Sequence, residues 1–302
     1  MSEESESAEA SDPADRAAAP GREDRERPDH ERRDGAPAPG VPTVAALAAP
    51  QSPADPAPQA VTVVGAATDI GRFRRVNEDG YLALAPAFIV VDGMGGHASG
   101  RAAARAALSA LVPLAGSRVV NQAQVVDAVV AAGEAVSALP SQATNPPGAT
   151  IAGAVLADLP EGRTWIVLNI GDSRVYLLRE DLLTQLSHDH SQVQDLVDAG
   201  WLTRAQAHRD SRRNVVTRAL GAGLDQAAYP EIRLVPARAG DRILVCSDGL
   251  SDELDDGELA TVLGSGMGAQ RTAEMAVAAA LEAGGHDNVT ALVVDLPECE
   301  AS

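Results

Sequence analysis

The chain has 302 residues, enough for one large domain or two small ones, and 45% of them are hydrophobic although only 2% are aromatic. A core of this composition must be built from valine, leucine, isoleucine and alanine. The formal net charge of -19 argues against general affinity for nucleic acid or an anionic membrane, because such binding needs a basic surface. The two cysteines, Cys246 and Cys299, are too few for a disulfide framework.

Residues 1–60 differ from the rest of the chain: they are rich in alanine, proline, acidic residues and arginine and contain no aromatic residue. Such a segment cannot bury enough apolar surface to offset its ordering entropy, so we expect a disordered N-terminal extension. The N-terminus has no apolar signal-peptide region, and no uncharged apolar stretch reaches the ~18 residues of a membrane helix. We therefore expect a cytoplasmic protein that does not engage a membrane.

From residue 61 to about 298 the pattern is that of a folded domain. Short, often β-branched runs predict strands at 61–69, 81–85, 87–92, 149–158, 164–172, 174–179, 232–235, 242–249 and 289–296. The spacing of apolar residues predicts two pairs of helices, one at 98–115 and 121–139, the other at 255–264 and 268–284.

The strands come in runs and the helices in pairs, unlike the strict alternation of a parallel doubly wound sheet. This order favours an α+β layered sandwich of mainly antiparallel sheets flanked by helices. The polar, partly helical segment at about 188–216 interrupts the strands, and we expect it to form a surface flap.

Acidic residues stand where predicted strands meet turns. Each is flanked by Gly, Ser or Asn, and the four are Asp92, Asp172, Asp248 and Asp287. A single Asp before Gly is usually a turn, but an acid at the end of an apolar strand is costly to bury without compensation. Glu78 and Asp79 add an acidic pair.

If these acids converge, they cannot all ionise side by side without a cation. Carboxylate and carbonyl oxygens favour Mg²⁺ or Mn²⁺ over zinc, and the six histidines form no cluster with zinc-site spacing. Pairs of such ions bridged by a carboxylate are suited to phosphoryl transfer.

The chain contains six sequence blocks in an order and spacing that resemble the bacterial metal-dependent serine/threonine protein phosphatases of type 2C: RRVNED, VVDGMGGHASG, NIGDSR, TRALG, CSDGL and GGHDNVT. The resemblance covers about residues 61–296. It implies a four-layer α-β-β-α sandwich with two mainly antiparallel central sheets flanked by helix pairs. It also implies hydrolysis of phosphoserine and phosphothreonine in proteins by direct attack of a water that bridges two Mn²⁺ or Mg²⁺ ions.

The resemblance carries over to individual residues. Asp92 is similar to the carboxylate that bridges both metals, and Gly93 to the residue whose carbonyl binds one of them. Asp248 and Asp287 would hold the other metal, and Glu78 resembles the acid that binds the second metal directly or through water.

Four further assignments follow from the same resemblance. Arg74 matches the arginine that binds the substrate phosphate; Arg75 is the rival, but its spacing to Glu78 differs by one residue. Arg74 joins Asp92, Asp248 and Asp287 in the catalytic set. Asp172 matches a position that recruits a third, weaker metal in bacterial relatives. Asp79 and Asn288 would support the ligands, Asp79 by orienting metal-bound water and Asn288 by shaping the loop around Asp287.

Met94 departs from part of the family, because many eukaryotic members carry there a histidine proposed to protonate the leaving oxygen. A thioether cannot donate a proton, so the donor stays open. Phosphorylated Ser/Thr proteins and their kinases are the implied partners. The alternative is a pseudophosphatase, a phosphoprotein-binding or regulatory module of the same fold.

Overall fold

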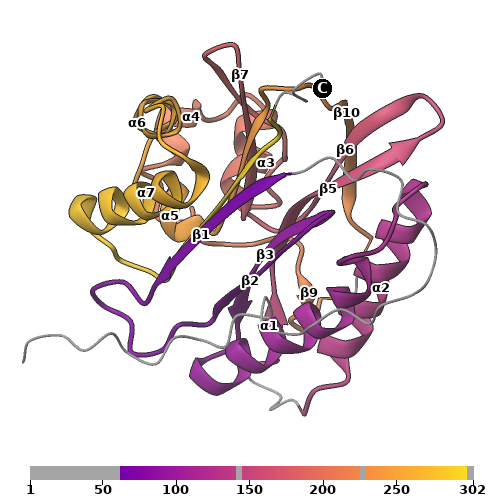
Figure 1. Cartoon of the computed structure of the whole chain (residues 1–302). Helices are drawn as coiled ribbons and strands as arrows, with labels where there is room; N and C mark the ends of the chain where they lie inside the picture. The colour runs from indigo at the N-terminus through magenta and orange to yellow at the C-terminus, as the bar shows by residue number, and fades with distance from the viewer. Residues whose placement is uncertain (1–61, 141–144, 225–228, 298–302) are drawn as a thin grey trace, which may run out of the picture. The chain divides into compact units, whose positions relative to one another are not determined.

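Two antiparallel sheets pack face to face in the computed structural model of this chain, which describes residues 62–140, 145–224 and 229–297 (Figure 1). These residues all lie in one compact unit, Gly40–Ser302. The predicted disordered extension at 1–60 lies outside the described residues, as does Cys299.

All strand pairings in both sheets are antiparallel. The five-stranded sheet has the order β1 (Val63–Asp69), β12 (Val289–Asp295), β11 (Arg242–Cys246), β7 (Arg174–Arg179) and β8 (Leu182–Gln185). The seven-stranded sheet has the order β10 (Glu231–Pro236), β6 (Gly162–Ile170), β5 (Ile151–Leu159), β3 (Ala87–Met94), β4 (Gly148–Ala149) and β9 (Leu220–Gly221), and β2 (Asp79–Leu84) pairs with β3.

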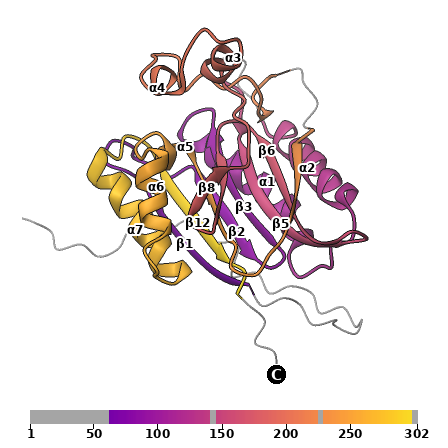
Figure 2. The same cartoon turned by 90° about the horizontal axis from the view of Figure 1, so that it is seen from above.

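Helices cover the outer face of each sheet (Figures 1 and 2). The seven-stranded sheet carries α1 (His97–Leu111), the 3-10 turn η2 (Val112–Leu114) and α2 (Gln122–Ser137). The five-stranded sheet carries α5 (Asp248–Ser251), α6 (Asp256–Leu263) and α7 (Ala269–Ala283). The predicted four-layer α-β-β-α sandwich is confirmed.

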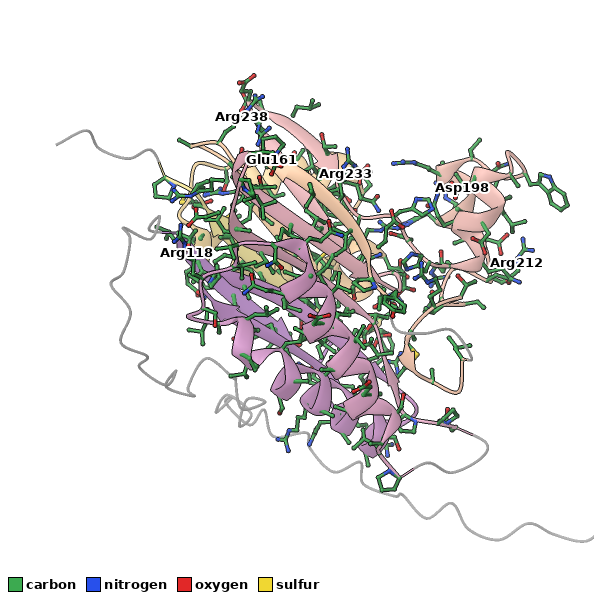
Figure 3. The ribbon with its side chains drawn as sticks, turned by 90° about the vertical axis from the view of Figure 1, so that its right-hand side faces the viewer. Arg118, Glu161, Asp198, Arg212, Arg233 and Arg238 are labelled. Carbon is green, nitrogen blue, oxygen red and sulfur yellow. The ribbon has the colours of Figure 1, made fainter. Side chains whose placement is uncertain are left out.

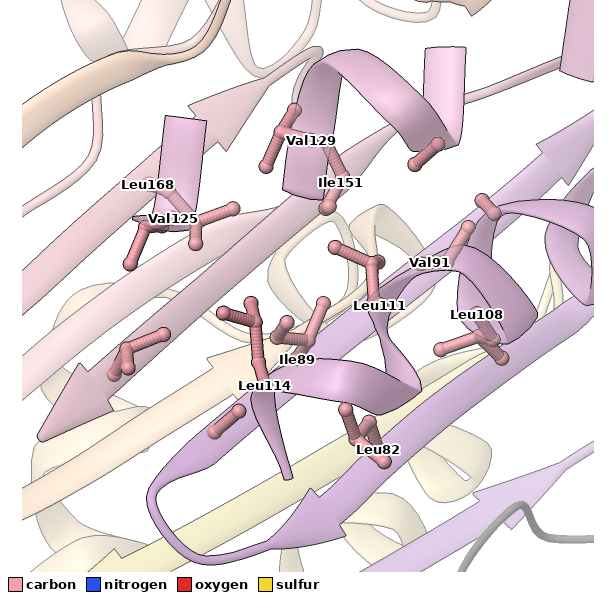
Figure 4. Packing of buried hydrophobic residues seen from close by; sticks show 14 of the residues in the cluster. Leu82, Ile89, Val91, Leu108, Leu111, Leu114, Val125, Val129, Ile151 and Leu168 are labelled. Atoms are coloured by element: carbon pink, nitrogen blue, oxygen red, sulfur yellow. The ribbon is translucent and has the colours of Figure 1, made fainter. Parts of the chain in front are cut away.

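Three apolar clusters bind the layers together, and the period-2 alternation of a strand explains them. On β3, Phe88 and Val90 face the cluster between the sheets, whereas Ile89 and Val91 face the cluster under α1 and α2 (Figure 4). A third cluster lies between the five-stranded sheet and α6–α7. β3 is buried on both faces, so the metal-site candidates at its end stand on a rigid base.

The predicted strands and helix pairs are confirmed with shifted ends, while several short elements were not predicted. The strand expected at 242–249 ends at Cys246, and Asp248 begins a four-residue helix instead. β4 and β9 have two residues each, too few for a period to appear in the sequence.

The segment predicted as a flap contains α3 (Gln192–Asp198) and α4 (Arg204–Ala207) and stands away from the sandwich (Figures 2 and 3). Its two ends are tied by backbone hydrogen bonds from Gln192 N to Val215 O, 2.9 Å, and from Thr217 N to His190 O, 2.8 Å. The side chain of Ser191 caps α3 by accepting a hydrogen bond from Gln194 N. Within the described residues, no helix has the length and apolar character needed to cross a bilayer.

A buried carboxylate links the two sheets. Asp241, 1% exposed, accepts a hydrogen bond from Trp165 Nε1 at 2.9 Å and two from Arg179 at 2.7 and 2.8 Å. Trp165 lies on β6 and Arg179 on β7, so this group joins a strand of each sheet.

We expect Asp241→Ala to lower the free energy of unfolding by about 3 kcal/mol, because the Trp165 N–H loses its acceptor and the Arg179 guanidinium keeps only the carbonyl of Pro236. Urea denaturation measures the loss. Arg118→Ala is the control, since Arg118 forms an exposed pair with Asp158 at 3.4 Å and should cost less than about 1 kcal/mol. Equal losses in the two variants would contradict the role of Asp241.

Candidate metal centre

The predicted site acids come together at one end of the sandwich. The end of β3 supplies Asp92, and the start of β2 supplies Asp79 directly opposite it in the β2–β3 register. The five-stranded sheet supplies the others: Asp172 precedes β7, Asp248 follows β11, and Asp287 precedes β12. In an antiparallel sheet, the end of one strand lies beside the start of its neighbour. Residues far apart in the chain therefore meet at this end of the sandwich.

Asp79 is held by hydroxyl groups of the facing sheet. Ser247 Oγ and Thr290 Oγ1 donate to Asp79 Oδ2 at 2.8 and 2.7 Å, whereas the buried Asp79 Oδ1 has no hydrogen-bond partner among the described residues. Burial raises the pKa of Asp79 to about 6 against the opposing effect of the two hydroxyl groups. One oxygen of Asp79 is thus fixed, and the other remains available.

Burial and like charge act together on the central carboxylates. Desolvation raises the pKa of Asp92 well above its ordinary value, and the charges of Asp79, Asp248, Asp172 and Asp287 raise it further. Burial likewise raises the pKa of Asp248, with Asp172 as the largest charged contributor. The acids predicted to converge are therefore close enough to repel one another.

Asp172 is 7% exposed, and burial raises its pKa to about 7. The largest charged contributor is Asp189, followed by Asp252. Asp252 is the C-cap residue of the short helix α5, one helical turn after Asp248, a spacing that the sequence displays in SDGLSD. Asp189 and Asp252 were not among the predicted site residues.

Two glycines bring the oxygens of Glu78 and Gly93 together. A Cβ placed on Gly100 would stand 2.4 Å from Glu78 Oε1 and 2.6 Å from the carbonyl oxygen of Gly93. A Cβ on Gly93 would in turn stand 2.1 Å from Gly100 O. Only glycine fits at both positions, so the two predicted ligand oxygens face the same point beside the first turn of α1.

Asp287 is engaged from two sides. Arg74 Nη2 pairs with Asp287 Oδ2 at 2.5 Å, and the backbone N–H of Asn288 donates to Asp287 Oδ1 at 2.7 Å. The Asn288 side chain donates to the carbonyls of Ile70 and Val76 and accepts from Glu78 N. This agrees with the predicted role of Asn288 in shaping the loop and also ties that loop to Glu78.

The donor set fits divalent cations. Asp79 Oδ1 and Asp248 Oδ1 are buried carboxylate oxygens with no hydrogen-bond partner in the described ranges, and every side-chain ligand candidate offers oxygen, as Mg²⁺ and Mn²⁺ prefer. Over residues 62–140, 145–224 and 229–297, no three His, Cys, Asp or Glu side chains already form a closed set of ligands. Hydrogen-bond donors of the protein contact Asp79 and Asp287 instead: Ser247 and Thr290 donate to Asp79, and Arg74 donates to Asp287.

Ser173 and Arg174, which directly follow Asp172, form contacts inside the fold. Ser173 Oγ and Thr150 Oγ1 share a hydrogen bond of 2.7 Å. Arg174 Nη2 and Nε donate to Asp189 Oδ2 at 2.6 and 2.8 Å, and Arg174 Nη1 donates to Tyr176 Oη. Arg174 therefore connects β7 with the start of the flap and partly offsets the charge of Asp189 beside Asp172.

The histidine pair in SHDHS also has a structural place. His190 Nδ1 accepts a hydrogen bond from Gly171 N at 3.0 Å, and burial lowers the pKa of His190. His188 Nε2 lies 2.9 Å from Asp198 Oδ2. Both histidines therefore form contacts within the fold at the start of the flap.

A cavity of about 670 Å³ lies between the flap and the helices α5 and α6. Asp172 and Asp248 line it on the metal-centre side, Arg204 and Arg209 on the flap side, and Glu253 on the wall of α5 and α6. Arg213 of the flap pairs with Asp252 at 3.4 Å across this space. The acids thus open into a space large enough for part of a protein substrate.

Comparison with known proteins supplies a family. The profile described as Protein phosphatase 2C matches residues 75–283, more than half of the chain. The match begins directly after Arg74 and ends shortly before Asp287, so these two predicted site residues lie just outside it.

Curated relatives agree with this family. The chain is 39% identical over 236 residues to the serine/threonine protein phosphatase PstP of Mycobacterium tuberculosis, which covers 76% of this chain and 44% of PstP. It therefore spans less than half of that relative. It is 31% identical over 241 residues to the serine/threonine phosphatase stp of Listeria innocua, covering 76% of this chain and 93% of the relative.

Solved structures share the fold. The catalytic domain of PstP in complex with two manganese ions is similar with a TM-score of 0.70 and 35% identity, covering 79% of this chain and 100% of that one. The family profile, the sequence identity to curated relatives and the similarity to solved structures agree. This chain belongs to the protein phosphatase 2C family.

Proposed function

We propose that this chain is a metal-dependent protein phosphatase that hydrolyses phosphoserine and phosphothreonine in proteins. The observation that carries the proposal is the group of carboxylates from both sheets, of which Asp79 and Asp172 are buried and Asp92 and Asp248 half-buried, with Arg74 beside it. Burial of several like charges is unfavourable without compensation, so such a group is best explained as a cation site. Phosphorylated Ser/Thr proteins as substrates, their kinases as partners and a cytoplasmic location stay predictions.

The residues divide into two sets of ligands. Asp92 would contribute to both cations, with the Gly93 carbonyl and Glu78 on one side and Asp248 and Asp287 on the other. Asp172, at the cavity and next to Asp248, suits a third and weaker cation. Asp79 would orient metal-bound water with its second oxygen, since Ser247 and Thr290 fix the first.

Mn²⁺ or Mg²⁺ bound here would neutralise charge on the phosphate and activate water for attack on phosphorus. The PstP catalytic domain has been solved with two manganese ions, which supports this choice of metal. The protein would add position and electrostatics, the two contributions that phosphoryl transfer needs most.

Arg74 suits the binding of the substrate phosphate. Its side chain is 44% exposed, and its guanidinium already pairs with a carboxylate of the metal centre at 2.5 Å. A planar guanidinium can donate two parallel hydrogen bonds to phosphate oxygens. A cation held by Asp287 would compete with Arg74 for that carboxylate and would leave the guanidinium for the phosphate.

The chain's described cysteine does not suit a covalent mechanism. Cys246 lies inside β11, is fully buried, and has a thiol pKa raised by burial to about 12. Because a thiol of this kind stays protonated, it cannot act as the nucleophile. Met94, half-buried at the end of β3, offers no proton, so direct hydrolysis leaves the source of the leaving-group proton open.

We expect Asp248→Asn to lower Mn²⁺-dependent hydrolysis of p-nitrophenyl phosphate and a phosphothreonine peptide by more than about 100-fold. Substitution of residues that support metal ligands typically lowers metal affinity or activity by about 10- to 100-fold, and loss of a charged ligand should cost at least as much. Asp127→Asn, an exposed change on α2, is the matched control. Wild-type turnover of the D248N enzyme at all Mn²⁺ concentrations would rule out this site.

For Arg74→Ala we expect kcat/KM to fall by about 100-fold, since a charge-assisted bidentate contact to phosphate is lost. The affinity for Mn²⁺ should not fall, because Asp287 loses a competing partner. Steady-state kinetics and calorimetric Mn²⁺ titration separate the two effects. A parallel loss of Mn²⁺ affinity would instead make Arg74 part of the metal site's support.

The affinity for Mn²⁺ should fall as the pH drops from about 8 to about 6. The pKa of Asp172 is about 7 and that of Asp79 about 6, so both take up protons in this window, and cations need the ionised form. Calorimetry at about pH 6.5 in two buffers of different ionisation enthalpy should detect proton release on binding. Asp172→Asn should release fewer protons; equal release by both proteins would contradict the assignment of Asp172.

A further inference from the structure

An exposed aromatic pair stands next to the metal centre. The rings of Phe73 and His286 are stacked with their centroids 5.0 Å apart and their planes 2° from parallel. Phe73 is 68% exposed, and the side chain of His286 is 66% exposed. The chain has only two phenylalanines, and the other, Phe88, is buried between the sheets.

Hydrogen bonds on both sides hold the pair in place. Glu253 Oε1 accepts from the backbone N–H of His286 at 2.9 Å and lies 2.7 Å from His286 Nδ1. Next to Phe73, Arg72 donates from its backbone N–H to Gly285 O and from Nε to Leu281 O, both at 2.7 Å. An aromatic face held outward in this way exposes apolar surface to water at a cost that an incoming apolar group would remove.

The pair is continuous with the proposed active site. Phe73 precedes Arg74 and His286 precedes Asp287, and Arg74 and Asp287 pair with each other at 2.5 Å. Glu253, which holds His286, also lines the cavity that Asp172 and Asp248 line. The stacked rings therefore stand beside the arginine that suits the phosphate and near the opening that a protein substrate would use.

We propose that the Phe73–His286 stack is a docking surface for an apolar side chain directly next to the phosphorylated residue of a protein substrate. The inference rests on the proposed phosphatase function. Neighbouring Cα atoms are about 3.8 Å apart, so the residues on either side of a phosphothreonine held at Arg74 are the substrate residues nearest to the stack. Aliphatic and aromatic side chains pack well on a flat ring pair, whereas glycine offers nothing to pack.

The test uses the full-length chain with Mn²⁺ and three phosphothreonine peptides. One has glycine on both sides of the phosphothreonine, and the others have leucine at the preceding or the following position. We expect the wild-type protein to hydrolyse one leucine peptide with a kcat/KM about fivefold higher than that for the glycine peptide. This preference is smaller than the discrimination of about 10- to 200-fold that an enclosed apolar pocket achieves. Phe73→Ala should remove this preference and leave kcat/KM for the glycine peptide unchanged.

Leu182→Ala is the matched control, because Leu182 is also 68% exposed but starts β8, beside the end of β7 farther from Asp172. It should keep the preference. The inference is overturned if the wild-type protein shows no preference or if the preference survives Phe73→Ala. In either case, hydrolysis of the glycine peptide still supports the phosphatase function. If no peptide is hydrolysed, the phosphatase function fails and the docking surface fails with it.

Discussion

Mutual repulsion among buried carboxylates is the constraint on which the rest of this structure depends. Asp92 and Asp248 are surrounded by other acids at the end of the sandwich, and both burial and like charge raise their pKa. A group of this kind is unstable as a set of free anions, so the fold must supply either protons or positive charge. The proposed cations satisfy this need and give the acids their chemistry.

The sandwich makes this unfavourable group tolerable by anchoring each member in rigid structure. β3 is covered on both faces, and Asp92 stands at its end. Ser247 and Thr290, from the other sheet, hold Asp79, so the site itself connects the two sheets. Gly93 and Gly100 let β3 and α1 approach closely enough for their oxygens to share one point.

The positive groups near the site are few in this acidic chain, and their partners separate their roles. Arg174 is used within the fold by Asp189, and Arg213, 43% exposed, joins the flap to Asp252. Arg74, 44% exposed, pairs with Asp287, a predicted ligand of the metal centre, and this contact favours Arg74 for the phosphate. The stacked Phe73 and His286 extend the same surface with apolar character, which suits a protein substrate better than a free phosphate.

The sequence by itself determined the layers and the identity of the acids. Period-2 and helical spacing predicted the main elements, and the strand-end positions of Asp92, Asp172, Asp248 and Asp287 marked them as a group. Only the tertiary structure decided which atoms meet: the hydroxyl pair on Asp79, the Glu78–Gly93 approach at Gly100, Asp189 beside Asp172, and the Phe73–His286 stack. Local spacing reports which face of an element is buried, but contacts between residues about 200 positions apart depend on how whole sheets pack.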